Sequence, residues 1–272
     1  MAQAIATGDH YKDEVQRQWD RDACGSQYVK GIEPDTLDWY LDVERYRYDH
    51  YGPWMPKLME FAGHRGEKVL EVGGGMGTDH AQFAKSGAIT TDLDLSSGHL
   101  EHAKRNFALR GLTGEFVHGD AENMPFEDGT FDVVYSNGVI HHTPDTARVV
   151  DEMYRVLKPG GKAIIMVYAE NSLHYWRTLF YSLGIAQGRL ERVSMGDIMS
   201  ESVELSEHGS KPLVKVYTPK RLHNLFRRFE QRTIYQRQMV PEERPAMLRR
   251  VPVALLERIM GWNLIIKAQK PR

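Results

Sequence analysis

The sequence predicts an α/β fold in which a mostly parallel sheet is covered by helices on both faces. Over residues 68–168, short apolar segments alternate with longer segments of helical pattern, and such alternation builds a parallel sheet. The first strand, Val69–Val72, is an apolar run with one acid that leads into three glycines and then into a helical segment from Thr78. This order of strand, turn and helix is typical of α/β proteins that bind a ligand at the end of the sheet.

The turn after the first strand carries Gly73, Gly75 and Gly77 at alternate positions. A glycine turn lets bare backbone approach a ligand, because no Cβ blocks the way. Alone, such a turn serves a dinucleotide, a phosphate or simple tight packing. The identity of the ligand therefore depends on the motifs that follow.

Four further strands are predicted, together with the helices that connect them. The second strand ends in Asp92 and Asp94, about 20 residues after the glycines, where an acid can bind both hydroxyls of a ribose. The later strands are Glu115–His118, Phe131–Asn137 and Lys162–Tyr168, the last one preceded by Leu157-Lys158-Pro159-Gly160-Gly161. The connecting helices are expected near Asp79–Ser86, Gly98–Arg110 and Thr146–Leu157, with Asp145 as the N-cap of the third.

This ordered series of motifs resembles the class I S-adenosylmethionine-dependent methyltransferases, in particular their small-molecule, UbiE/methyltransferase-11-like branch. The resemblance is dense over residues 65–170 and looser at both ends. It implies a Rossmann-like sheet of seven strands, with Gln231–Gln238 and Asn263–Lys270 as an antiparallel pair at one edge and a helix over Val251–Met260 between them. It also implies that S-adenosyl-L-methionine is the cofactor.

The same resemblance divides the chain into four parts. They are an aromatic helical N-terminal lid (1–64), a Rossmann-like cofactor-binding core (65–168), an inserted substrate cap after strand five (169–217) and a C-terminal completion of the core sheet (218–272). In the cap, Leu173–Leu183 is amphipathic and aromatic, and Thr218 with Pro219 opens a helix in the last part.

The resemblance also implies which residues hold the cofactor. Glu71 and the glycine turn would lie beside its methionyl part. Asp94 would bind the ribose hydroxyls, because Asp94-Leu95-Ser96 fits the family pattern of acid, hydrophobic residue and serine better than Asp92 does. Asp92 is then expected to be a surface or neighbouring acid.

At the adenine, Asp120 would accept a hydrogen bond from the amino group and the Ala121 backbone would lie at the ring. Leu95 and Met124 are expected as apolar walls. A residue such as Asp120 after Gly119 is also an ordinary turn former, so a purely structural role for it is the alternative.

Asn137-Gly138-Val139-Ile140-His141-His142 follows the fourth strand, where the family places residues around the transferred methyl group. It is not the Asn/Asp-Pro-Pro-Tyr/Phe pattern of many enzymes that methylate amino groups of nucleic acids, which argues against DNA adenine or cytosine-N4 as the substrate. His141 or His142 is a candidate general base, because imidazole titrates near neutral pH. The alternative is that they orient the loop or pack on the cofactor. Adjacent histidines are expected to point in different directions, so no metal site is predicted.

The N-terminal segment is unusually aromatic. Eight of the chain's 27 aromatic residues lie between Trp19 and Trp54, and helices are expected over Glu44–Tyr51 and Trp54–Ala62 with a break at Gly52-Pro53. Their tyrosines would either face the sulfonium cation of the cofactor or form the buried face of two helices packed on the sheet edge. Tyr28 and Tyr48 are the candidates for lining the cofactor pocket.

Composition excludes several classes of protein. No run approaches 18 apolar residues, so no membrane span is expected. The first residues lack a secretion signal and Cys24 is the only cysteine, which fits a cytoplasmic setting. Residues 215–272 carry 14 Lys+Arg and 4 Asp+Glu, a net charge of +10, whereas residues 1–214 carry 21 and 33, a net charge of −12. Without aromatic interleaving, the basic segment is interpreted as a solvated face, and no nucleic-acid partner is expected.

The sequence therefore predicts an enzyme that transfers a methyl group from S-adenosylmethionine to an oxygen, nitrogen or carbon nucleophile of a small molecule by in-line displacement. The alternatives are methylation of RNA or protein and a non-catalytic protein that binds the cofactor. A dinucleotide-dependent oxidoreductase is disfavoured, because the motifs at 120–126 and 157–161 would have no role in it. The acceptor and the oligomeric state do not follow from the sequence.

Overall fold

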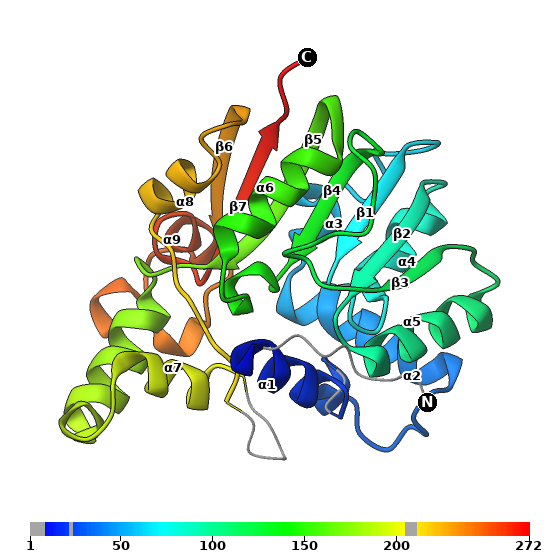
Figure 1. The fold of residues 1–272 in the computed structure, drawn as a ribbon. Helices are drawn as coiled ribbons and strands as arrows, with labels where there is room; N and C mark the ends of the chain where they lie inside the picture. The colour runs from blue at the N-terminus through cyan, green and yellow to red at the C-terminus, as the bar shows by residue number, and fades with distance from the viewer. Residues whose placement is uncertain (1–8, 22–23, 205–210) are drawn as a thin grey trace.

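A computed structural model describes residues 9–21, 24–204 and 211–272. In these residues, one seven-stranded sheet has the order β3-β2-β1-β4-β5-β7-β6 (Figure 1). The strands are β1 (Lys68–Val72), β2 (Ile89–Asp94), β3 (Glu115–His118), β4 (Phe131–Asn137), β5 (Leu157–Tyr168), β6 (Glu230–Arg237) and β7 (Asn263–Gln269). The first five are parallel, and β7 runs antiparallel to both β5 and β6. The predicted fold class is confirmed.

Helices cover both faces of the sheet because side chains of the inner strands alternate between two cores. Leu70 and Val72 point to the face covered by α6 (Thr146–Val156) and α8 (Pro219–Leu225). Val69 points to the opposite face, where it packs with Phe83 of α4 (Thr78–Lys85). The other helices of the sheet region are α5 (Ser97–Arg110), which follows β2, and α9 (Val253–Met260), which precedes β7. As predicted, Asp145 caps α6, and its side chain accepts the Arg148 N–H at 3.0 Å.

The N-terminal region differs from the prediction in two ways. The helix expected over 44–51 is α2 (Leu37–Arg45) continued by a π-helical stretch (Tyr46–Tyr51), and the one expected over 54–62 is the short α3 (Met55–Leu58). Met55 and the residues after α3 pack on the face of the sheet with Val69 and Phe83. The expectation that these helices pack on the sheet edge is therefore wrong, because this face would otherwise expose its apolar side chains.

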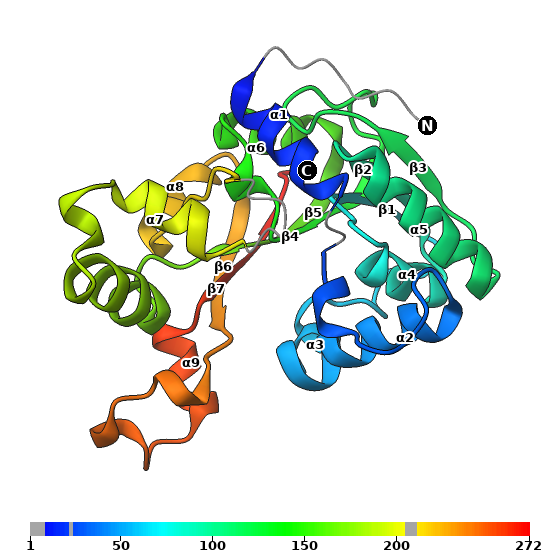
Figure 2. The ribbon, with the colours of Figure 1, turned by 90° about the horizontal axis from the view of Figure 1, so that it is seen from below.

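Helix α1 (His10–Trp19) lies apart from these helices, across the carboxyl ends of the parallel strands (Figure 2). Its Gln16 Nε2 donates to the Leu95 carbonyl at 3.0 Å, and its Asp20 cap accepts the Gly98 N–H at 3.0 Å. These contacts attach α1 to the segment between β2 and α5. The helix thereby becomes a wall of the space above the strand ends.

The segment after β5 forms a helical subdomain beside the sheet. It contains a π-helical segment (His174–Ala186), a 3₁₀ turn (Arg189–Glu191) and α7 (Met195–Ser202). The π-helical segment includes most of the amphipathic, aromatic stretch noted at 173–183. Leu179, Met199 and Trp262 form part of a small core that joins the subdomain to the start of β7. Among the described helices, none is long and apolar enough to cross a membrane.

Candidate cofactor site

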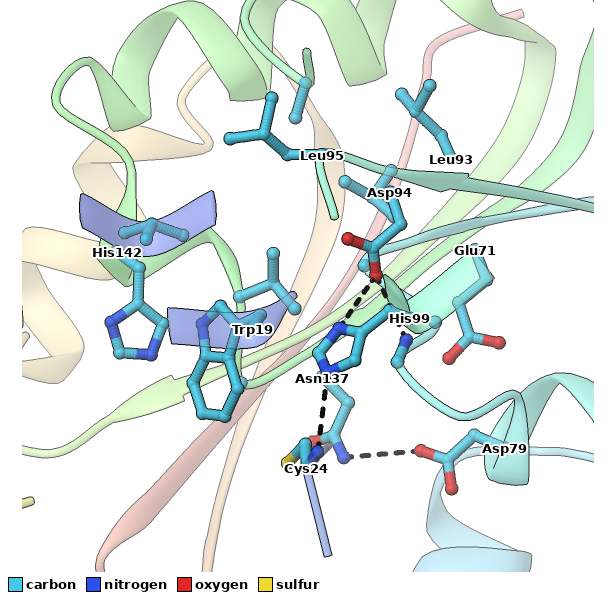
Figure 3. Close-up of a pocket in the computed structure, with 18 of the residues that line it drawn as sticks. Trp19, Cys24, Glu71, Asp79, Leu93, Asp94, Leu95, His99, Asn137 and His142 are labelled. Carbon is cyan, nitrogen blue, oxygen red and sulfur yellow. Dashed lines mark hydrogen bonds and ion pairs between the residues drawn. The ribbon is translucent and has the colours of Figure 1, made fainter. Parts of the chain in front are cut away.

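One pocket opens at the carboxyl ends of β1, β2 and β4, beneath α1 (Figure 3). The parallel register aligns these ends, because Val72 pairs with Leu93 and the preceding Glu71 pairs with Tyr135. Nine of the predicted site residues line this pocket: Glu71, Gly73, Gly75, Asp94, Leu95, Asp120, Ala121, Asn137 and His142. Sequence motifs that lie far apart in the chain thus meet in one place.

The glycine turn needs each of its glycines for a different reason. Gly73 has φ +77°, and a Cβ there would overlap the side chain of Val139. Gly75 has φ +57°, and its missing Cβ leaves the pocket side open. Gly77 has φ +72° and packs against Ala103, so the start of α4 lies close to α5. It does not line the pocket. Bare backbone therefore faces the pocket at Gly73 and Gly75.

Asp94 lies at the centre of a hydrogen-bond network at the end of β2. Its carboxylate accepts the Ser96 N–H at 2.8 Å and the Gly75 N–H at 3.2 Å, and His99 Nδ1 lies 3.4 Å away. The Cys24 N–H points at His99 Nε2 from 3.3 Å, so Nε2 is the acceptor and the proton of the neutral ring is on Nδ1, facing Asp94. The carboxylate is thereby held at the pocket in a fixed orientation.

Asp92 is fully buried below the glycine turn, so the expectation of a surface acid is wrong and that of a neighbouring acid fits. One carboxylate oxygen accepts the Gly74 N–H at 3.0 Å, and the other has no hydrogen-bond partner among the described residues. Burial raises the pKa of Asp92 well above its usual range, and the nearby charges of Asp94 and Glu71 raise it further. Asp92 thus supports the turn from below.

A buried cluster around Asp79 forms the floor of the pocket near β1 and β4. Arg47 binds both carboxylate oxygens at 2.6 Å, and the hydroxyls of Tyr48 and Tyr135 donate to them at 2.7 and 2.6 Å. Asn137 Nδ2 lies 3.3 Å away. Burial alone would raise the pKa of Asp79, but the Arg47 charge and the donated hydrogen bonds hold it below its usual range. A charged pair thus lines the pocket where the sequence suggested only tyrosines.

Lys12 of α1 closes the opposite side of the pocket. Its Nζ contacts Asp120 at 2.7 Å and Glu122 at 2.6 Å. Burial would lower the pKa of Lys12, but the hydrogen bonds and charges of the two acids raise it. Trp19, at the end of α1, faces His99 and His142 at ring distances of 5.6 and 6.5 Å. The helix that covers the site is therefore α1.

The remaining predicted residues lie outside the pocket lining. Tyr28 is half exposed and stacks on Tyr46 at 4.1 Å, and Tyr48 holds Asp79. Met124 is buried in the core beneath α6. The sequence analysis missed Lys12, Arg47 and Asp79. The only local signal was Asp79, an acid directly after the glycine turn, because a buried acid requires a cation. That cation is Arg47, which lies 32 residues away in the chain.

The two histidines after β4 have different environments. His142 lines the pocket, and its Nδ1 lies 2.7 Å from the Leu213 carbonyl, so Nδ1 carries a proton and donates it there. His141 is completely buried, with its ring 4.1 Å from that of Tyr168. Burial, together with His142 and Lys215, lowers the pKa of His141 well below its usual range. Of the two histidines, only His142 lines the pocket.

Comparison with known proteins agrees with this geometry. The methyltransferase domain family matches residues 70–165. A demethylmenaquinone methyltransferase of Clavibacter sepedonicus is 38% identical over 104 residues, covering 38% of this chain and 42% of the relative. A phthiotriol/phenolphthiotriol dimycocerosates methyltransferase of Mycobacterium ulcerans is 34% identical over 175 residues, covering 62% of this chain and 60% of the relative. The chain thus spans about two to three fifths of the curated relatives it matches.

Solved structures share the fold. A phosphoethanolamine N-methyltransferase 2 of Haemonchus contortus, in complex with S-adenosylhomocysteine, superposes with a TM-score of 0.62 at 18% identity, covering 97% of this chain and 61% of the other. A SAM-dependent methyltransferase of Methanosarcina mazei gives a TM-score of 0.57 at 20% identity, covering 79% and 97%.

Residues 70–165 therefore match a methyltransferase domain, and S-adenosylmethionine is the cofactor of the class of enzyme that this match indicates. The similarity extends to a UbiE C-methyltransferase of Idiomarina loihiensis, which is 32% identical over 123 residues, covering 43% of this chain and 49% of the relative.

Proposed function

We propose that this chain transfers the methyl group of S-adenosylmethionine to a small-molecule acceptor. The observation that carries the proposal is the pocket itself, in which a bare glycine turn, four acids and an amide meet at one edge of a parallel sheet. The cofactor supplies an activated methyl group on its sulfonium. The protein then has to hold an oxygen, nitrogen or carbon nucleophile in line with that methyl group and exclude water.

The lining residues suit the three parts of the cofactor. Asp94 is a fixed carboxylate acceptor for the ribose hydroxyls. Asp120, beside Leu95 and Ala121, offers a carboxylate and apolar surface for adenine. Glu71, Gly73 and Asn137 would lie beside the methionyl part, where the Arg47–Asp79 pair offers both charges to its ammonium and carboxylate groups.

The acceptor would enter on the side of His142 and Trp19. These two side chains are a polar and an aromatic group at that end of the pocket, and Trp19 belongs to α1. At the adenine end, Lys12 of the same helix contacts Asp120. The relatives are named for demethylmenaquinone and phthiotriol dimycocerosates, which supports a partly apolar acceptor of medium to large size. His141 is too buried to face that acceptor.

The test is calorimetric titration of the purified chain with S-adenosylmethionine and S-adenosylhomocysteine, with NADH as the control. We expect the first two to bind and NADH not to bind. Quinols, phenols, acids and amines are then screened for formation of S-adenosylhomocysteine by mass spectrometry. Binding without turnover on any acceptor would favour the non-catalytic alternative, and failure of both adenosyl compounds to bind would overturn the proposal.

A further inference from the structure

A group of buried nitrogen atoms beside the pocket has no hydrogen-bond partners in the part of the chain that the structure describes. They are both ring nitrogens of His141 and the Nε2 of His142. Buried polar atoms in folded proteins are nearly always paired, and each exception requires an explanation. Here three exceptions fall on two adjacent side chains.

A carboxylate from the inserted subdomain completes the group. Glu204 follows α7, and its Oε1 lies 3.5 Å from His142 Nε2. One donor atom from each of His141, His142 and Glu204 lies within 4.8 Å of the other two. The sequence suggested that adjacent histidines would point apart, but in their 3₁₀ turn (Ile140–His142) the ring centres are only 4.2 Å from each other. That expectation is therefore wrong.

The surrounding hydrogen bonds leave the Nε2 atom of His142 free to bind a cation and hold the Glu204 carboxylate beside it. His142 donates its Nδ1 proton to the Leu213 carbonyl at 2.7 Å, which leaves the Nε2 lone pair on the side of Glu204. Tyr168 donates its hydroxyl proton to Glu204 Oε1 at 2.6 Å. Carbonyl and hydroxyl partners of this kind orient the ligands in metal sites.

We propose that His141, His142 and Glu204 bind one divalent transition-metal ion, with Zn²⁺ the expected occupant. Two imidazoles and one carboxylate form a donor set that suits zinc and its neighbours, whereas Mg²⁺ prefers oxygen ligands alone. Three protein ligands leave a coordination position open, as in catalytic zinc sites. Since His142 also lines the cofactor pocket, that position lies where an acceptor hydroxyl would arrive.

An ion pair between His142 and Glu204 is the competing explanation. It accounts for His142 Nε2 at 3.5 Å, but it leaves both nitrogens of His141 buried and unpaired. Two other potential ligands are engaged elsewhere: His174 pairs with Glu243 at 2.6 Å, and Asp145 caps α6. A bound cation would pair with one nitrogen of each of the two histidines.

The test measures metal binding directly. The purified full chain is stripped with a chelator, dialysed, and titrated by calorimetry with Zn²⁺ and with Mg²⁺; Co²⁺ is added to a parallel sample as a spectroscopic probe. We expect one Zn²⁺ per chain, no competition by Mg²⁺, and visible absorption bands of Co²⁺ with histidine ligands. Glu204→Gln should weaken Zn²⁺ binding at least tenfold. Tyr168→Phe keeps the ring but removes the hydroxyl, and it should weaken binding by about tenfold.

Two control variants make the result specific. His174→Ala removes a histidine of the inserted subdomain that is also paired with a carboxylate, that of Glu243. Cys24→Ser removes the thiol. Both variants should bind Zn²⁺ like the wild type. Circular dichroism melts check that each variant is folded. Absence of stoichiometric Zn²⁺ binding, equal affinity in Glu204→Gln, or loss of binding in Cys24→Ser would overturn the proposal. Only the role of the open position rests on the proposed methyl transfer, and titration of the same sample with S-adenosylmethionine tests that function separately.

Discussion

At the scale of single residues, the two acids of β2 have different surroundings although only one residue separates them. Asp94 holds two backbone N–H groups at the edge of the pocket, whereas Asp92 is buried beneath the turn. Both side chains lie on the same face of β2, because residues two apart share a face, so the difference follows from the point at which the strand ends, which is at Asp94. Of the two acids, only Asp94 can therefore contact a ligand in the pocket. Substituting each acid separately tests this difference.

We expect Asp94→Ala to weaken binding of S-adenosylmethionine at least tenfold. A ribose hydrogen bond to a charged group contributes about 1.5–3 kcal/mol, and a tenfold loss of affinity corresponds to about 1.4 kcal/mol. Calorimetric titration measures the change. Asp92→Asn is the control, because it alters a neighbouring acid that does not line the pocket. Unchanged affinity in Asp94→Ala would reject the ribose assignment.

Asp92→Asn has its own consequence, which concerns the pH dependence of stability. The pKa of Asp92 is raised in the folded protein, chiefly by burial, while in the unfolded chain it is about 3.9. Its contribution to stability is therefore complete below about pH 4 and is lost as the pH rises toward the folded-state pKa. Asparagine cannot ionise and can still accept the Gly74 N–H.

Urea denaturation from pH 5 to pH 8 measures this effect. We expect the free energy of unfolding to fall less steeply with rising pH in Asp92→Asn than in the wild type. Some slope should remain, because burial also raises the pKa of Glu71. Identical slopes in the two proteins would show that Asp92 is ionised in the folded state throughout this range.

At the scale of elements, the turn between β1 and α4 depends on the loop after β4. Gly73 requires a left-handed backbone and has Val139 where a Cβ would lie, whereas Gly111, the C-cap of α5, has φ +63° and open space around it. An alanine at either position meets a backbone cost of about 1–2 kcal/mol. Only at position 73 is a steric clash added to that cost.

We therefore expect Gly73→Ala to be destabilised by about 1–3 kcal/mol more than Gly111→Ala. Adding Val139→Ala to Gly73→Ala should restore part of the loss, because it removes the side chain that clashes. Chemical denaturation of the three variants gives these differences. Equal losses in Gly73→Ala and Gly111→Ala would mean that the loop after β4 moves away without cost.

The strands and the glycine turn could be predicted from the sequence because their signals are local. Phe131–Asn137 and Glu115–His118 begin and end as predicted, since apolar periodicity and turn residues act within a few positions. The walls of the site could not be predicted in this way. Lys12 meets Asp120 across 108 residues, and Glu204 meets His142 across 62 positions. Such pairs depend on where separate elements dock, which no local pattern records.

At the scale of the whole molecule, the charge asymmetry along the chain is partly neutralised by folding. Basic side chains of the C-terminal segment pair with acids of the earlier part. These pairs are Arg221–Glu170 at 2.8 Å, Arg228–Asp151 at 2.8 Å and Lys267–Glu60 at 2.6 Å. The two arginine pairs are largely exposed and contribute little to stability, whereas Lys267 and Glu60 are mostly buried. All three pairs place opposite charges side by side. The net charge of +10 in residues 215–272 is therefore partly offset by acids of the earlier part of the chain.

This arrangement predicts the outcome of a binding experiment with RNA. A polyanion binds to a run of unpaired cations and releases counterions, so its affinity falls steeply with salt. Because several cations here are matched by acids of the same molecule, we expect labelled single-stranded RNA to bind with a Kd weaker than about 10⁻⁴ M at physiological salt. Fluorescence anisotropy at rising salt concentrations measures it. Micromolar binding with a steep salt dependence would instead favour RNA as the substrate, and loss of that binding in Arg249→Ala/Arg250→Ala would locate the contact on the exposed arginine pair before α9.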